Sequence, residues 1–206
     1  MFRTIISLIS DMTEFGDISE QGFIYEDLLP LKWQTSDKEP SSLDMAKFDA
    51  MNEEVLRFID VLDEHSSEGG IDHSSINQEL AKVDIKFDLL LSLVTQLLSV
   101  YFPLPDPVQV KLTPYGVQWI SDEIINPGSC GLLELYITSR CPRSLIFPVQ
   151  IDSAEKDGEA YRISAQFGEI SGPIRERLEK MIFRHHRRGV ALARRKVVTD
   201  PEMPSL

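Results

Sequence analysis

The chain has 206 residues, of which 42% are hydrophobic and 26% are charged, and this balance excludes an intrinsically disordered or a membrane-embedded protein. The formal net charge of -12 is unevenly distributed, because residues 1–70 carry 16 acidic and 5 basic side chains whereas residues 171–206 carry 4 and 9. We therefore expect a soluble protein with an acidic body and a basic C-terminal end.

The first 22 residues are expected to form an N-terminal segment outside a single domain that spans residues 23–196. The segment begins with an apolar run that contains only Arg3 as a basic residue. Asp11 and Glu14 follow this run without a small-residue cleavage pattern, so a signal peptide is the weaker interpretation.

The sequence also indicates where the protein resides. A membrane-spanning helix needs about 18 consecutive apolar residues, and the strongest candidate, Leu89–Leu98, is interrupted by three polar residues. No membrane span is therefore expected. Two cysteines, Cys130 and Cys141, are too few for a disulfide framework, which favours the cytoplasm.

The first expected elements are a strand and an amphipathic helix. The strand covers Phe23–Trp33, and Pro30 within it favours an edge position, because proline cannot donate a hydrogen bond to a sheet. Ser41 and Asp44 have the spacing of a capping box and predict the start of the helix. Its apolar residues recur at three-four spacing: Phe48, Met51, Val55, Phe58 and Leu62.

A heptad repeat follows between Ile76 and Tyr101. Its apolar positions alternate strictly at spacings of four and three: Ile76, Leu80, Val83, Phe87, Leu90, Val94, Leu97 and Tyr101. A repeat sustained for more than three heptads predicts a coiled-coil helix with at least one partner helix. Ser75 and Gln78 have the spacing of a capping box and predict its start, and Pro103 predicts its end.

We call these apolar heptad positions the seam, and two interpretations of it remain open. In the first, the two helices form a hairpin within one chain, and each covers the other. In the second, several chains assemble through the seam. Leu91, Leu93 and Leu98 widen the apolar face beyond what one partner helix requires, so self-assembly in a multi-helix bundle is the sharper expectation.

From Val108 onwards the apolar residues alternate with polar ones, as is typical of strands. Thr113–Gly116 and Asn126–Gly128 are expected turns. Further strands are expected at Gly131–Thr138, Leu145–Ile151 and Glu159–Phe167. Five or six short antiparallel strands predict a small barrel or sandwich, with the two helices inserted at residues 41–102.

The last expected element is a helix that is capped by Ser171 and has Pro173 near its first turn. Its apolar stripe consists of Ile174, Leu178, Met181 and Ile182. Its basic end contains Arg184, His185, His186, Arg187, Arg188, Arg194, Arg195 and Lys196. Residues 197–206 are expected to be a flexible tail.

The basic helix allows two interpretations. It either packs on the acidic N-terminal region through salt bridges, which we favour, or binds nucleic acid. Nucleic-acid binding is the weaker alternative, because no aromatic residue follows Phe183 and the acidic body repels phosphates.

The order of these elements carries a resemblance to a known family. It comprises a strand, an inserted pair of heptad helices, a hairpin around LTPYG, an NPG turn, the string L-x-F-P-V, and the ending FGEISGPIRERLEKMIFRHHRRGVALARRK. Over residues 23–196 the chain resembles the PilZ domain in its atypical, helix-inserted branch, which is associated with bacterial cyclic di-GMP signalling. The resemblance implies an α+β fold: a small antiparallel PilZ-like β-barrel with an inserted pair of long heptad helices and a C-terminal helix.

The resemblance also nominates ligand-binding residues. PilZ domains carry a D/N-x-S-x-x-G motif in a hairpin, and it aligns here with residues 111–116. Gly116 matches the motif, Thr113 replaces serine, and Lys111 replaces the acid or amide. PilZ domains that bind cyclic di-GMP also place R-x-x-x-R before the barrel, because arginine forks clamp phosphates.

This upstream arginine pair is missing. Before Phe23 the chain has only Arg3, and its one R-x-x-x-R is formed by Arg184 and Arg188 on the C-terminal helix. The candidate residues for cyclic di-GMP are therefore Lys111, Thr113, Gly116, Arg184 and Arg188, and we expect a degenerate nucleotide site. A genuine receptor that recruits Arg140, Arg143 or the C-terminal cluster is the alternative.

No catalytic pattern stands out, since no phosphate loop, Ser-His-Asp order or paired catalytic carboxylates are evident. His185 and His186 point about 100° apart on a helix, so no metal is expected.

We expect a non-enzymatic cytoplasmic signalling module without a cofactor. It assembles, with a tetramer favoured, through the seam from Ile76 to Tyr101, and it acts on an unidentified protein partner.

Overall fold

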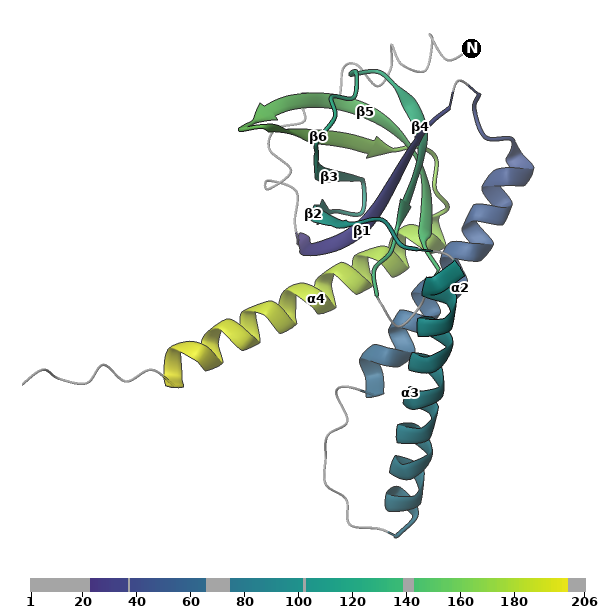
Figure 1. The fold of residues 1–206 in the computed structure, drawn as a ribbon, viewed down its shortest axis with the longest axis vertical. Helices are drawn as coiled ribbons and strands as arrows, with labels where there is room; N and C mark the ends of the chain where they lie inside the picture. Colours follow the sequence, from purple (N-terminus) through teal and green to yellow (C-terminus); the bar gives the residue numbers. More distant parts are fainter. Residues whose placement is uncertain (1–22, 37, 66–74, 102, 139–142, 200–206) are drawn as a thin grey trace, which may run out of the picture.

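The computed structural model describes residues 23–36, 38–65, 75–101, 103–138 and 143–199, and it describes their side chains except at 64–65, 75–82, 84, 88, 99 and 191–199. Six strands and three helices are labelled in Figure 1. Their bounds are β1 Tyr25–Thr35, α2 Ser42–His65, α3 Ser75–Tyr101, β2 Pro107–Leu112, β3 Gly116–Ser121, β4 Cys130–Leu135, β5 Leu145–Asp157, β6 Ala160–Phe167 and α4 Gly172–Thr199.

The strands form a closed antiparallel barrel in the order β1-β2-β3-β6-β5-β4. Alternate residues of each strand point inward and form the core. These residues include Leu29, Val110, Leu112, Val117, Trp119, Leu133, Leu135, Leu145, Phe147, Val149, Ile151 and Ile163. The expected fold class is confirmed: α2 and α3 lie between β1 and β2 in the chain, and α4 follows the barrel.

The expectation of an edge strand at the N-terminus is wrong. Residues Tyr25–Pro30 of β1 pair with β2, and Leu31–Thr35 pair with β4, so β1 closes the barrel. Pro30 is tolerated because it lies where β1 changes partner. Its carbonyl accepts a hydrogen bond from the Tyr136 amide at 3.1 Å.

The helix α2 is fixed to the barrel by apolar contacts and by one buried amide. Val55, Leu56 and Ile59 are at most 6% exposed. The buried Asn52 side chain donates to the Ile146 carbonyl at 2.8 Å and accepts from the Ile146 amide at 2.7 Å. This pair satisfies both backbone groups of Ile146 and sets the position of α2 on β5.

The helix signals in the sequence are borne out at α2 and α4. The Ser41 amide donates to the Asp44 carboxylate, and the Asp44 amide donates to the Ser41 hydroxyl, both at 3.2 Å, which completes the expected capping box. On α4 the apolar stripe is buried: Ile174, Leu178, Met181 and Ile182 are at most 2% exposed.

The helix α3 is different, because its apolar seam is open. Its described seam residues Val83, Phe87, Leu90, Val94, Leu97 and Tyr101 are between 52% and 71% exposed. The buried residues of α2 pack in the core with the barrel and α4, so α2 does not cover this seam. The hairpin interpretation is therefore wrong for the described part of the seam. The side chains of Ile76 and Leu80 lie outside the described residues.

Candidate functional site

The turn between β2 and β3 contains Thr113 and Gly116. The Thr113 amide donates to the Gly116 carbonyl at 2.9 Å. The Thr113 hydroxyl donates to the same carbonyl at 3.1 Å, and it accepts from the amides of Tyr115 at 3.3 Å and Gly116 at 3.1 Å. A hydroxyl has one proton and two lone pairs, so the turn uses the full hydrogen-bonding capacity of the Thr113 hydroxyl.

Gly116 has a packing role at the same turn. It begins β3 and pairs with Gln166 of β6. A Cβ atom on Gly116 would lie 2.5 Å from the backbone oxygen of Ala165, which is too close for a real carbon–oxygen contact. Glycine is therefore required here for β3 to approach β6.

Lys111 lies on the outer face of the barrel, beside a shallow hollow. Its ammonium group is 3.2 Å from the Glu26 carboxylate of β1. The hollow is lined by Gln109, Lys111, Gln118, Trp119, Ile120 and Arg162. The second cation of the hollow, Arg162, pairs with Asp157 at 2.5 Å, so each basic side chain there already has an acidic partner.

Arg184 and Arg188 lie elsewhere, on the face of α4 that packs against α2. Arg184 pairs with Asp60 and also approaches Asp63 at 3.5 Å, while Arg188 pairs with Asp63 at 2.7 Å. The prediction that the basic helix forms salt bridges with the acidic N-terminal region is confirmed. No contact that the structure describes joins these arginines to the barrel turn, so the five predicted ligand residues fall into two separate sets.

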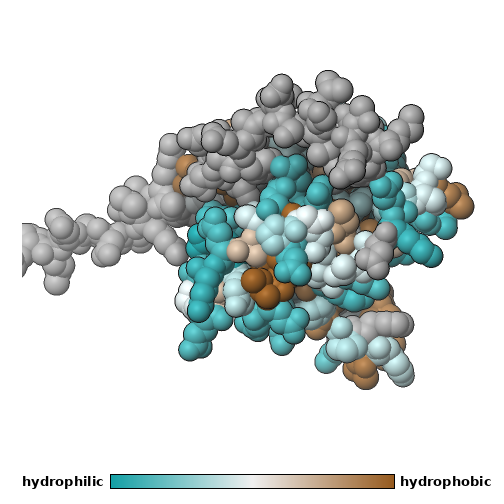
Figure 2. Space-filling view, turned by 90° about the horizontal axis from the view of Figure 1, so that it is seen from above, coloured by the Kyte–Doolittle hydropathy of each residue, from teal (hydrophilic) through white to brown (hydrophobic). Residues whose placement is uncertain are grey.

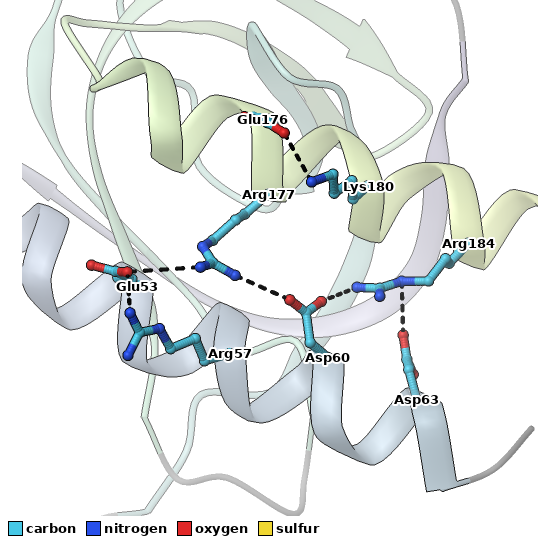
Figure 3. A network of polar contacts seen from close by, with 8 residues as sticks. All are labelled: Glu53, Arg57, Asp60, Asp63, Glu176, Arg177, Lys180 and Arg184. Atoms are coloured by element: carbon cyan, nitrogen blue, oxygen red, sulfur yellow. Dashed lines mark hydrogen bonds and ion pairs between the residues drawn. The ribbon is translucent and has the colours of Figure 1, made fainter.

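The α2–α4 network contains a residue that the sequence interpretation missed. Arg177 reaches Asp60 at 3.3 Å and Glu53 at 3.8 Å, and Figure 3 shows it aligned with Arg184 along α4. The signal was present, because Arg177 and Arg184 are seven residues apart, as are Glu53 and Asp60. Equal spacing on two helices that run side by side aligns their charges.

The large apolar side chains that are exposed on the described surface are concentrated on α3. Besides the seam itself, Ile85, Leu89, Leu93 and Val100 are each more than half exposed. No charged residue occurs from Leu89 to Tyr101. By contrast, the described surface seen from above the barrel is mostly hydrophilic, with only small hydrophobic spots (Figure 2). A helix that is apolar on most sides is normally buried.

A comparison with protein families identifies the fold. The family model described as "Atypical PilZ domain, cyclic di-GMP receptor" matches residues 55–195. The chain belongs to the atypical PilZ domain family. This match confirms the resemblance that the order of the elements indicated, and it includes α3, the barrel strands from β2 onwards, and most of α4.

A solved structure shares the fold of this PilZ domain. It is a protein from Xanthomonas campestris, described as a new tetrameric PilZ domain that self-assembles via an unusual helical bundle. The two chains are 21% identical and align with a TM-score of 0.65, over 90% of this chain and 97% of the other. No curated protein matches the chain.

Other site classes receive no support from the described part of this PilZ domain. It contains no group of three or more histidine, cysteine or acidic side chains that could hold a metal ion. None of its described helices combines the length and the hydropathy that crossing a bilayer requires.

Proposed function

We propose that this atypical PilZ domain is a non-enzymatic cytoplasmic signalling module that assembles as a tetramer through the seam of α3. Its barrels are then presented in several copies to a protein partner, and its nucleotide site is degenerate. The module works without a metal or a cofactor. The observation that carries the proposal is the open seam of α3.

The energetics of α3 favour assembly. Each large aliphatic or aromatic side chain gains about 1.5–3 kcal/mol when it is fully removed from water, and six described seam residues are more than half exposed. Three further exposed or half-buried leucines flank the seam: Leu91, Leu93 and Leu98. A face this wide is satisfied by several helices rather than one, and the tetrameric relative supports the same arrangement.

The degenerate site is supported by how the candidate residues are used. The Thr113 hydroxyl has no hydrogen-bonding capacity left for a ligand, and Gly116 is explained by the packing of β3 on β6. Lys111 is held by Glu26. Arg184 and Arg188 are paired with Asp60 and Asp63 of α2.

Substitutions in the seam test the assembly. We expect Leu90→Asp combined with Val94→Asp to reduce the mass measured by light scattering to that of one chain, because two buried charges are incompatible with a helical core. Ser92→Asp adds a charge to the same helix outside the seam and should leave the mass unchanged. An unchanged mass in the double variant would contradict the proposal.

The alternative function is direct binding of cyclic di-GMP. It is favoured by the description of the matching family as a cyclic di-GMP receptor and by the two cations beside the barrel hollow. We expect titration calorimetry with cyclic di-GMP to give no binding heat. Micromolar or tighter binding that is lost in Lys111→Ala and kept in Lys156→Ala would establish the receptor instead.

A further inference from the structure

A second exposed patch lies on α4, away from α3. It consists of Phe23, Phe183, His186, Arg187 and Val190, and we call it the α4 end patch. Phe23 and Phe183 meet edge to face with ring centroids 4.8 Å apart, yet they remain 49% and 40% exposed. The His186 ring lies 5.1 Å from Phe23.

The patch is a continuous face of the helix. Phe183, Arg187 and Val190 are spaced at four and three residues and therefore lie on one side of α4. The Arg187 guanidinium lies 5.8 Å from the Phe183 ring centroid, and Val190 is 39% exposed. This part of α4 extends beyond the barrel (Figure 1).

The neighbouring face of α4 is occupied by a different partner. Arg184 and Arg188 turn towards Asp60 and Asp63 of α2. Arg187 has no acidic partner among the ion pairs that the structure describes. The α4 end patch thus combines half-exposed aromatic rings with a cation that remains available to an acidic, apolar segment.

The chain itself provides such a segment, because residues 1–22 lead directly into Phe23. The segment is rich in large apolar residues: Phe2, Ile5, Ile6, Leu8, Ile9, Met12, Phe15 and Ile18. Its charged residues are Arg3, Asp11, Glu14, Asp17 and Glu20. The segment therefore has a negative net charge, opposite in sign to the basic end of α4.

We propose that residues 1–22 bind to the α4 end patch of their own chain. Their apolar side chains cover Phe23, Phe183 and Val190, and their carboxylates lie near Arg187. The covalent link to Phe23 favours this contact, because a short tether holds the segment at a local concentration of about millimolar order. This inference does not depend on the assembly through α3.

Hydrogen–deuterium exchange on the full chain tests the contact. Ile5→Asp combined with Ile9→Asp should speed exchange of the amides in residues 184–192 by about tenfold, because covered backbone becomes accessible. Ser7→Asp combined with Ser10→Asp adds the same charge at polar positions and should leave that exchange unchanged. Equal exchange in wild type and the isoleucine variant would overturn the proposal.

A substitution on α4 tests the same contact from the other side, with exchange in residues 1–22 as the readout. Arg187→Glu should speed exchange within residues 1–22, whereas Lys180→Glu, on the same helix but outside the patch, should not.

A mixture of isotope-labelled wild-type chains and chains of the isoleucine variant distinguishes contact within one chain from contact with a neighbouring copy. Loss of protection confined to the variant chains supports contact within one chain. Loss of protection in both kinds of chain would overturn it in favour of a neighbouring copy.

Discussion

Thr113 and Gly116 show how residues that align with a ligand motif serve the fold. The Thr113 hydroxyl closes the β2–β3 turn with three hydrogen bonds. Gly116 lets β3 approach the Ala165 carbonyl of β6. Both residues would be needed for this turn whether or not a ligand binds, so a match to the motif does not by itself indicate a binding site.

Two substitutions of Thr113 separate the stabilisation that comes from its hydroxyl from the stabilisation that comes from the shape of its side chain. We expect Thr113→Val to lower the free energy of unfolding by about 1–3 kcal/mol, because the amides of Tyr115 and Gly116 lose their acceptor in a buried turn. Thr113→Ser keeps the hydroxyl and should cost less. Denaturant titration measures both variants, and equal losses would indicate that the hydroxyl contributes nothing.

We expect Asp152 to make the stability of the fold depend on pH. It lies at the irregularity in β5 between Ile151 and Ser153, and desolvation raises the pKa of its carboxyl from 3.8 to about 6, although a hydrogen bond with Gln166 opposes this shift. A carboxyl with a raised pKa in the folded state favours folding when protonated. The contribution of the Asp152 carboxyl to the free energy of unfolding is therefore present below pH 4 and is lost as pH rises through 6.

Removal of this carboxyl should flatten the pH dependence. We expect Asp152→Asn to unfold at a higher temperature than wild type at pH 7.5, because the amide carries no charge to desolvate. The difference should shrink as pH falls from 7 towards 4. Thermal unfolding at several pH values measures it, and a difference that is constant with pH would refute the role of Asp152.

Among the elements, α2 and α4 are joined by a ladder of alternating charges. Asp60 accepts from both Arg177 and Arg184, and its side chain is only 24% exposed. Figure 3 shows the carboxylate of Asp60 between the two guanidinium groups. The ladder explains why the basic end of the chain is compatible with folding against an acidic helix.

Asp60 should be the most sensitive position of the ladder. We expect Asp60→Asn to cost about 1–3 kcal/mol, because two partly buried arginines lose a charged partner. Glu176→Gln breaks the exposed pair with Lys180 and should cost much less than Asp60→Asn, because solvent screens this pair. The Asp60 effect should be smaller in 1 M salt, where the screening length falls to about 3 Å. Denaturant titrations at two salt concentrations test this, and equal losses for the two variants would contradict it.

Local signals in the sequence predicted most elements of the fold. The Ser41–Asp44 capping box, the stripe on α4 and the turn at Thr113 depend on neighbouring residues, and each is found as expected. The position of β1 was predicted wrongly, because closure of a barrel depends on strands far apart in the chain. Pro30 indicates a missing donor but not which strand lies beside it.

The candidate site was less predictable than the fold. The family resemblance nominated Lys111, and the R-x-x-x-R spacing nominated Arg184 and Arg188, as cations for a ligand. Neither could show that each of them faces an acidic side chain. Such partners are set by tertiary packing, and Glu26 and Lys111 are far apart in sequence. The ligand roles of these residues remain predictions that calorimetry with cyclic di-GMP will test.

For the whole molecule, the open seam of α3 is the feature that the single chain does not explain. The barrel, α2 and α4 share one core, whereas described seam residues from Val83 to Tyr101 stay more than half exposed. An apolar face of this kind is stable in water only when it is covered. The proposed tetramer covers it with other copies of the same helix.

Sedimentation equilibrium of the wild-type chain at micromolar concentration tests this claim most directly. The proposal predicts a mass four times that of the 23.4 kDa chain. It also predicts that this mass persists on dilution, because the buried seam is large and apolar. A single species of 23.4 kDa at all concentrations would contradict assembly through α3.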